Sequence, residues 1–401
     1  MSERERVLSG MRPTGALHIG HYHGALKNWV RLQDAHECFY FVADWHALTT
    51  HYESVEVLSD SVWQMLIDWL AAGIDPQRAT IFLQSRVPQH AELFLLLGMV
   101  TPLAWLERVP TYKDTIEKLK DRDLSTYGFL GYPLMQAADI LIYRATQVPV
   151  GEDQVPHIEM TREIARRFNR LFGAEPDFEE KAQAVLRKLG AEQADGFLQA
   201  RQRYQRDGDR EALAAGRRLI GQASGLASAE RQRLAGYLEG TGRIILVEPA
   251  AALTETPKLP GTDGQKMSKS YGNAILMREA PKALTEKIRR MATDPARVRR
   301  SDPGDPQRCP VWQLHRVYSS EATQQWVDRG CRSAGIGCLD CKQPLIEALL
   351  AEQAVWHERA QPYLAKPQRL REIVEDGCAR ARRVAEETMA DVRAAMGLQY
   401  A

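Results

Sequence analysis

Apolar runs alternate with amphipathic stretches along the first 175 residues of the chain. The runs at residues 6–10, 38–44, 79–83 and 147–150 are typical of strands that are buried on both faces of a sheet. Between and after them, residues 18–33, 59–72, 91–100 and 155–172 carry apolar side chains at helical spacing. This alternation predicts an α/β fold with a doubly wound, Rossmann-like parallel sheet.

The remaining chain is mostly helical in pattern. Residues 176–243 are rich in Ala, Arg, Gln, Glu and Leu, with helical stretches at 179–189 and 210–222, and predict a helical insertion. Strand character returns at residues 244–247, and the pattern is helical again from about residue 278. We therefore expect a catalytic-type domain from residues 1–175 and 244–277, an insertion at 176–243, and an all-α domain at 278–401.

Composition adds few constraints to this picture. The 401 residues are 44% hydrophobic and 26% charged, with a net charge of +1, as in an ordinary globular protein. No apolar run is long enough to cross a bilayer, and no apolar segment follows the charged first residues, so we expect a cytoplasmic protein without membrane contact. Any nucleic-acid contact must come from local basic patches.

Two segments far apart in the chain carry candidate chemistry. Residues 13–21 read PTGALHIGH, and residues 266–270 read KMSKS. A helix that begins near His18 would present His18 and His21 on one face of an N-terminus that attracts anions, and Gly20 would let a ligand approach the backbone. A loop with two lysines can close on a triphosphate and neutralise charge in the transition state. The pair predicts an ATP site.

Zinc binding by the two histidines is a weaker alternative. Metal sites on helices favour histidines four residues apart, with a third ligand nearby. His18 and His21 are only three residues apart.

The two segments resemble the HIGH and KMSKS signatures of class I aminoacyl-tRNA synthetases. Within that class the chain is most similar to the bacterial tryptophanyl-tRNA synthetases. The matching stretches are SGMRPTG at residues 9–15, ADWHAL at 43–48, AADIL at 137–141, and VPVGEDQ at 148–154 followed by His157 and Glu159. The resemblance implies a homodimer that activates L-tryptophan with ATP and Mg²⁺ and then charges tRNA(Trp). The helical C-terminal domain would read unpaired anticodon bases.

The resemblance also implies roles for individual residues. His18, His21, Lys266 and Lys269 would be catalytic, and Asp139, Tyr132 and Gln136 would bind tryptophan. The residues expected to bind ATP are Arg12, Pro13, Thr14, Gly20, His21, Gly151, Glu152, Asp153, Lys266, Met267, Ser268, Lys269 and Ser270. Lys113 could also reach the ATP phosphates, although an exposed lysine without a role is an equal alternative.

Asp139 has a physical reason for its expected role. Indole has one hydrogen-bond donor and no acceptor, so a buried carboxylate facing it forms a charge-assisted bond that a phenyl ring cannot replace. Without the flanking motif, a helix cap or a paired structural carboxylate would be the better interpretation of this residue.

Alternatives to the tryptophan-specific enzyme remain open. Many bacterial relatives have Met where this chain has Gln136, and Tyr132, Gln136 and Asp139 reproduce a spacing that tyrosyl-tRNA synthetases use. A tyrosyl-tRNA synthetase is therefore the nearest alternative. A non-catalytic sensor of tryptophan or RNA is another, although a sensor has no use for Lys266 and Lys269.

Four of the six cysteines are grouped in the C-terminal part of the chain: Cys309, Cys331, Cys338 and Cys341. Four thiolates in one segment suit a [4Fe–4S] cluster or a tetrahedral Zn²⁺. A subset of tryptophanyl-tRNA synthetases has very similar spacing and holds a [4Fe–4S] cluster, which the resemblance favours here, with zinc or four free thiols as the alternatives. Cys38 and Cys378 look like ordinary buried residues.

Overall fold

A five-stranded parallel sheet lies at the centre of the molecule. The computed structural model describes residues 4–52, 56–109, 126–253 and 259–400. The strands are β1 (Arg6–Met11), β2 (Glu37–Val42), β3 (Ala79–Leu83), β4 (Gln147–Val150) and β5 (Ala250–Leu253). They lie side by side in the order β3-β2-β1-β4-β5, and all four neighbouring pairs are parallel. The α/β, doubly wound fold predicted from the apolar runs is confirmed.

Helices cover this sheet. They are α2 (Lys27–Leu32), α3 (Asp44–His51), α4 (Glu56–Ala72), α5 (Gln89–Gly98), α6 (Leu103–Glu107), α8 (Tyr127–Ile142) and α9 (Val155–Phe172). The four amphipathic stretches predicted in the first 175 residues overlap α2, α4, α5 and α9. Their apolar faces meet the strands in one core, where Trp29 stacks on Tyr40 at 4.5 Å between ring centroids. The sheet thereby becomes a rigid platform for the segments at its carboxyl edge.

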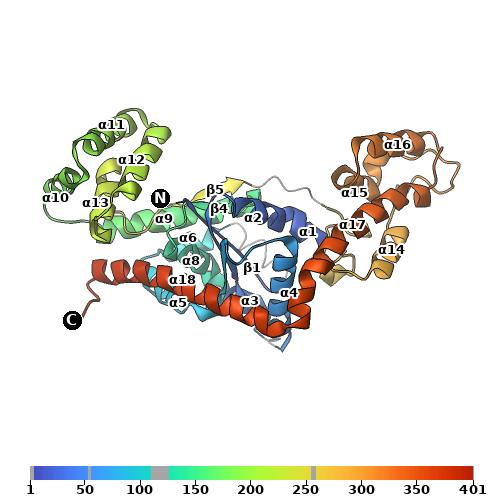
Figure 1. Ribbon diagram of the computed structural model, residues 1–401, viewed down its shortest axis with the longest axis horizontal. Coiled ribbons are helices and arrows are strands. Elements are labelled where there is room, and N and C mark those ends of the chain that lie inside the picture. Colours follow the sequence, from blue (N-terminus) through green and yellow to red (C-terminus); the bar gives the residue numbers. More distant parts are fainter. Residues whose placement is uncertain (1–3, 53–55, 110–125, 254–258, 401) are drawn as a thin grey trace.

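Two helical groups lie at opposite ends of the longest axis of the molecule (Figure 1). At one end, α10 (Phe178–Leu186), α11 (Ala191–Asp207), α12 (Arg210–Gln222) and α13 (Ser228–Glu239) enclose a hydrophobic core of their own. At the other end are α14 (Pro281–Arg290), α15 (Pro310–Tyr318) and α16 (Glu321–Arg332), and buried residues of α14 and α15 continue the core of the sheet.

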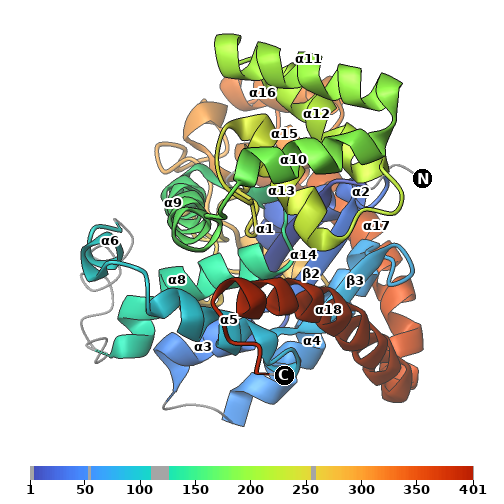
Figure 2. The same cartoon turned by 90° about the vertical axis from the view of Figure 1, so that its left-hand side faces the viewer.

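The last two helices return the chain to the sheet. They are α17 (Cys338–Ala365) and α18 (Pro367–Ala395), and α18 runs along the sheet domain toward the insertion (Figures 1 and 2). A Cβ atom on Gly377 would lie 1.8 Å from the carbonyl oxygen of Ile81 on β3, so only glycine allows this close approach. In this way α18 covers the edge strand β3, which would otherwise be open to pairing with another chain.

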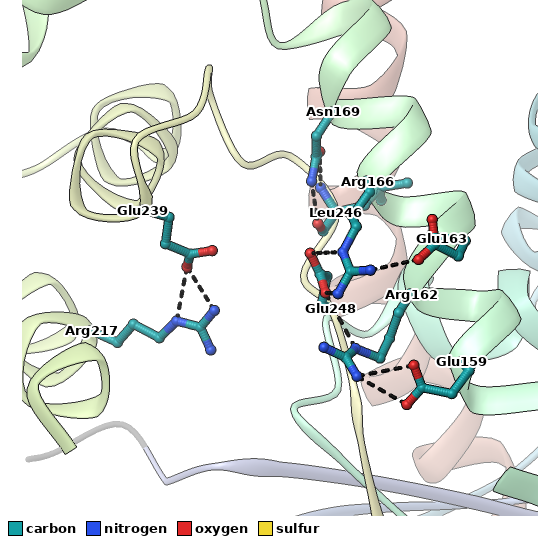
Figure 3. A network of polar contacts seen from close by, with 9 residues as sticks. All are labelled: Glu159, Arg162, Glu163, Arg166, Asn169, Arg217, Glu239, Leu246 and Glu248. Carbon is teal, nitrogen blue, oxygen red and sulfur yellow. Dashed lines mark hydrogen bonds and ion pairs between the residues drawn. The ribbon is translucent and has the colours of Figure 1, made fainter. Parts of the chain in front are cut away.

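The strand predicted at residues 244–247 was wrong, because β5 begins later, at Ala250. Ile245 and Leu246 are fully buried, but their N–H groups donate to the side-chain oxygen of Asn169 on α9, at 2.9 and 3.0 Å. Asn169 Nδ2 donates in return to the carbonyl of Leu246, as Figure 3 shows. One asparagine side chain therefore satisfies the backbone where a neighbouring strand would have done so.

An ion-pair network fixes the same segment further along. Glu248 accepts hydrogen bonds from both Arg162 and Arg166 of α9, and these arginines also pair with Glu159 and Glu163 (Figure 3). The segment thus leads from the insertion to β5 along α9.

Within the parts of the chain that the structure describes, no helix is both long and apolar enough to cross a membrane.

Candidate functional site

The first signature segment follows the carboxyl end of β1. Gly15 has a φ of 84°, which turns the chain so that His18 caps the short helix α1 (Ile19–His21). The single helix predicted over residues 18–33 was wrong in detail, because a π-helical turn (Tyr22–Leu26) separates α1 from α2. Such π-turns inside helices are common at functional sites.

The two histidines of this segment lie together, as the helical spacing predicted. The His18 and His21 rings stack with their centroids 3.7 Å apart, and the backbone N–H of His18 donates to His21 Nδ1. A Cβ on Gly20 would come within 2.9 Å of the His18 ring, so the position of this ring favours glycine here. Nδ1 of His18 is buried without a hydrogen-bond partner among the described residues.

Both imidazoles are neutral at pH 7. Burial and then the charge of Lys269 lower the pKa of His18 to about 4. Burial, His18 and Lys269 together lower the pKa of His21 to about 3. These side chains can therefore donate hydrogen bonds to an anion, but they bring no positive charge of their own before it binds.

The second signature loop lies against the first segment. Lys269 Nζ donates to the backbone carbonyls of Thr14 and Ala16, the latter at 2.7 Å. The loop keeps its shape through Asn273, whose Oδ1 accepts from the N–H of Ser268 and whose Nδ2 donates to the carbonyl of Lys266. Lys266 and Ser270 are exposed, whereas Met267 is buried beneath them. The loop thus presents its polar side chains and anchors itself by its methionine.

Backbone pairing joins the two signatures. Ile19 N–H donates to the carbonyl of Ile275, and Met277 N–H donates to that of Leu17. Asp68 on α4 accepts from the Leu17 N–H at 2.6 Å and from Arg278 at 2.5 Å. These contacts fix the first signature segment against the chain that directly follows the loop carrying Lys269.

The GEDQ turn follows β4 at the same edge of the sheet. Gly151 caps a 3₁₀ turn (Glu152–Gln154), in which the side chains of Glu152 and Asp153 are exposed. Arg12 and Thr14 are exposed after β1, and Pro13 between them is buried. These six residues expected to bind ATP therefore follow two adjacent strands, at the edge where parallel sheets bind ligands.

Tyr132 and Gln136 of α8 lie on opposite sides of one imidazole. His157 of α9 bonds to Gln136 Oε1 at 2.8 Å through Nδ1 and to the Tyr132 hydroxyl at 3.4 Å through Nε2. Burial lowers the pKa of His157 to about 4, so it is a neutral spacer at pH 7. The two residues expected near the substrate amine are thus oriented by a third.

Asp139 lies one turn further along α8 and is almost entirely buried, at 1% exposure. Its Oδ2 accepts from His46 Nε2 at 2.9 Å, and its Oδ1 accepts from His90 Nδ1 at 2.6 Å. Gln84 Nε2 donates to both oxygens, at 2.8 and 3.0 Å. Burial alone would raise the pKa of Asp139, but the bonds from His46 and His90 outweigh it and lower the pKa below its usual range.

Sequence reasoning had not identified these partners as members of the site. His46 stood inside the ADWHAL motif without a role, and Gln84 directly follows β3, which was a usable signal. His90, Asp68 and Asn273 gave no signal in the sequence. Lys113 lies outside the described residues.

The four grouped cysteines come from three helices. Cys309 caps α15, Cys331 lies near the end of α16, and Cys338 and Cys341 occupy the first turn of α17. Burial and the other three thiols raise the pKa of Cys341 to about 12, so the four sulfurs lie within electrostatic reach of one another. Among the described residues, however, no group of three or more His, Cys, Asp or Glu side chains is arranged to hold a metal ion.

Comparison with known proteins gives consistent results. The family described as "tRNA synthetases class I (W and Y)" matches residues 1–191 and 223–352. The chain is 66% identical over 396 residues to the tryptophan–tRNA ligase of Ralstonia nicotianae, which covers 99% of both chains. It is 45% identical over 397 residues to that of Thermotoga maritima, covering 98% of this chain and 100% of the other.

Solved structures agree with these sequence matches. The tryptophanyl-tRNA synthetase of Campylobacter jejuni, complexed with ADP and tryptophan, superposes with a TM-score of 0.72 at 29% identity. The superposition covers 98% of this chain and 99% of the other.

Proposed function

Because this chain belongs to the class I tRNA synthetases of the tryptophan and tyrosine group and acts as a tryptophan–tRNA ligase, we propose which of its residues carry out each part of the reaction. In the first step, the carboxylate of tryptophan attacks the α-phosphate of ATP and releases pyrophosphate. No side chain needs to serve as nucleophile or base, because a carboxylate is already ionised. Positioning and electrostatics then supply the rate enhancement.

His18 and His21 donate hydrogen bonds to the phosphates, while Lys266 and Lys269 provide positive charge. The neutral imidazoles fit this role, since two imidazolium ions stacked at 3.7 Å would repel each other. Mg²⁺ bound to the substrate ATP would supply further positive charge beside the pyrophosphate leaving group. The nucleotide is lined by Arg12, Pro13, Thr14 and Gly20, by the turn residues 151–153, and by the loop residues 267, 268 and 270.

The tryptophan side chain binds against α8. The indole N–H donates to Asp139, while Tyr132 and Gln136 hold the α-amino group. Oδ2 of Asp139 carries one full bond from His46 and shares the Gln84 amide with Oδ1, so an ionised carboxylate has capacity there for one more donor. A phenyl ring offers no donor at this position, which disfavours phenylalanine.

One observation carries the assignment of the catalytic loop. Lys269 Nζ lies 2.7 Å from the carbonyl of Ala16, between the two signature segments. When ATP binds, this ammonium can leave the backbone carbonyls and bind phosphate oxygens instead. Its positive charge would then lie beside the negative charge that develops in the transition state.

Exchange of labelled pyrophosphate into ATP tests the proposal directly. We expect exchange that depends on tryptophan and is weak with tyrosine at the same concentration. Exchange that is equally fast with tyrosine would favour a tyrosyl enzyme. No exchange with either amino acid, from protein that still binds tryptophan, would point to a sensor.

The second step transfers tryptophan to the terminal ribose of tRNA(Trp), in the cytoplasm. The catalytic part (residues 1–175 and 244–277) and the helical part (278–401) would share the tRNA, the latter reading the anticodon. The insertion (176–243) has a separate core, and the family match is interrupted at residues 192–222 inside it. This supports an added module that the reaction itself does not require.

Cys309, Cys331, Cys338 and Cys341 would hold a [4Fe–4S] cluster, with Zn²⁺ as the alternative. An all-sulfur donor set fits both groups. Arg297 lies 3.9 Å from the sulfur of Cys331, and Lys342 is buried within electrostatic reach of three of the thiols, so cations are present to compensate thiolate charge. The cluster would brace the helical domain rather than take part in adenylation.

A homodimer is supported by apolar side chains exposed on neighbouring helices. Four such side chains are 56–69% exposed: Leu95 on α5, Met99 just after α5, Leu103 on α6 and Tyr127 on α8. A patch of this kind is a common mark of a protein interface. A second copy of this chain is the occupant that we propose.

A further inference from the structure

His90 is as deeply buried as Asp139, and both of its ring nitrogens are engaged. Nδ1 lies 2.6 Å from Asp139 Oδ1, and Nε2 lies 2.7 Å from the hydroxyl of Tyr143. His90 is 1% exposed and Tyr143 is 0% exposed. Phe41 and Phe82 lie within about 6 Å of the imidazole, at 6.1 and 6.0 Å between ring centroids. Water therefore has no access through which it could replace either bond.

The order of donors along this chain of groups follows from chemistry. Burial, together with the nearby Asp139 carboxylate, raises the pKa of Tyr143 well above its usual value, so its hydroxyl is protonated and donates to His90 Nε2. The proton of a neutral His90 then lies on Nδ1 and is donated to Asp139. Tyr143 thus selects the tautomer in which His90 can support a carboxylate.

The two oxygens of Asp139 differ as a result. Oδ1 faces His90 and Gln84 inside the core, whereas Oδ2 faces His46, which is 9% exposed. A carboxylate held at Oδ1 cannot rotate to present that oxygen elsewhere. Oδ2 therefore remains the oxygen that is available to an incoming donor.

We propose that His90, held in one tautomer by Tyr143, is a positioning residue for tryptophan selection, which keeps Asp139 ionised and turns Oδ2 toward the indole N–H. This inference rests on the proposed role of Asp139. His90 would not touch the substrate and would act only through the carboxylate. Its loss should weaken tryptophan binding without changing how ATP binds.

Among the residues that the structure describes, other titratable groups around the carboxylate are few. His46 faces it from α3 and lies within electrostatic reach of His157 of α9. Cys378 of α18 lies within electrostatic reach of Tyr143. Burial raises the pKa of Cys378, so its thiol is uncharged at pH 7. Removal of His90 therefore leaves His46 and Gln84 as the donors to Asp139.

The test is the Michaelis constant for tryptophan, measured by pyrophosphate exchange from pH 6 to pH 8. His90→Leu should raise this constant by about ten- to a hundredfold at pH 6, as expected for loss of a charge-assisted bond. The increase should shrink toward pH 8, because the carboxylate, with a higher pKa, regains its charge there. The wild-type constant should be nearly flat over this range, and the constant for ATP should be unchanged in the variant.

Two more conservative variants test whether the effect of His90→Leu is caused only by misfolding. His90→Asn places an amide N–H near the position of Nδ1 and should restore most of the tryptophan affinity. Tyr143→Phe should show a smaller pH-dependent weakening of tryptophan binding, because it lacks the hydroxyl that fixes the tautomer of His90. Tyr40→Phe is the matched control, since Tyr40 is equally buried but bonds to the carbonyl of Trp29. It should change neither the constant nor its pH dependence.

The outcomes separate the inference from the function on which it rests. An unchanged constant in His90→Leu and Tyr143→Phe, or a loss that is the same at every pH, overturns the inference. If His90→Leu does not fold, Tyr143→Phe decides by the same criterion. If Asp139→Asn itself activates tryptophan normally, the proposed role of Asp139 fails first, and the inference fails with it.

Discussion

Asp68 and Arg278 form a buried ion pair that joins the two signature segments of the chain. The Nε of Arg278 lies 2.5 Å from Asp68 Oδ1, and the two side chains are 11% and 1% exposed. The other oxygen of Asp68 accepts from the N–H of Leu17, directly before His18. A single carboxylate thus holds the start of the HIGH segment against the chain that follows the KMSKS loop.

Asp68→Ala should therefore be strongly destabilising. Removal of the carboxylate leaves the Leu17 N–H unpaired and the largely buried Arg278 with Gln64 as its remaining partner, and we expect a loss of about 3–5 kcal/mol in the free energy of unfolding. Urea denaturation measures this loss. Asp376→Ala is the matched control, because its pair with Arg380 is on the surface and should contribute less than about 1 kcal/mol. Equal losses in the two variants would contradict the prediction.

Lys269→Ala should slow adenylate formation far more than it weakens tryptophan binding. The ammonium acts on charge that develops in the transition state, so we expect kcat to fall by about a hundred- to a thousandfold. Pre-steady-state release of pyrophosphate measures this rate. Lys282→Ala, an exposed lysine of α14, should behave as wild type. A raised Michaelis constant for tryptophan with unchanged kcat would refute the role.

Asp139→Asn should reduce tryptophan affinity by about 1.5–3 kcal/mol, the contribution of a charge-assisted hydrogen bond. An amide can still contact His46 and His90, but it offers its NH₂ group to one of these donors and carries no charge for the indole. Equilibrium dialysis with tryptophan and, separately, with ATP measures the effect. ATP binding should be kept, and a parallel loss of both ligands would indicate general damage instead.

Acidification should destabilise the protein between about pH 6.5 and pH 4. The pKa values of His18, His23 and His157 are lowered to about 4, mainly by burial, while in the unfolded chain they return to their ordinary value of 6.5. The unfolded state therefore takes up protons first as the pH falls, and stability that is complete above 6.5 is lost toward 4. Each histidine can contribute up to about 3 kcal/mol to this loss.

Urea unfolding at several pH values tests this dependence. His18→Asn, which cannot take up a proton, should show a shallower decline than wild type. A wild-type free energy of unfolding that stays constant from pH 6.5 to 4 would show that the three imidazoles are not kept neutral.

Protein purified without oxygen from iron-replete cells should be brown and contain about four irons per chain. Cys338→Ser should remove the colour and weaken tRNA charging while pyrophosphate exchange survives, because the grouped cysteines lie in helices α15–α17, far from Asp139. Cys378→Ser, at a buried cysteine outside the group, should keep the iron. Colourless protein with one zinc per chain would replace the cluster with a zinc site, and metal-free protein would exclude both.

Local patterns were sufficient for strands β1 to β4 and for the two signatures. Residues 6–10, 79–83 and 147–150 were recognisable because strands buried on both faces must be continuously apolar, and helix α9 was located to the residue by its amphipathic period. The strand expected at 244–247 failed because a side chain of α9, Asn169, satisfies that backbone, and a local pattern carries no record of a distant partner.

What the sequence determined by itself is the fold class, the ATP signatures and the family resemblance, since each depends on residue types at short, fixed spacing. Only the tertiary structure decided which side chains hold Asp139. His46, Gln84 and His90 come from three separate elements, and all three donate to a carboxylate on a fourth. A buried charge must be satisfied by whatever donors the fold brings within about 3 Å, and that is a property of packing rather than of neighbouring residues in the chain.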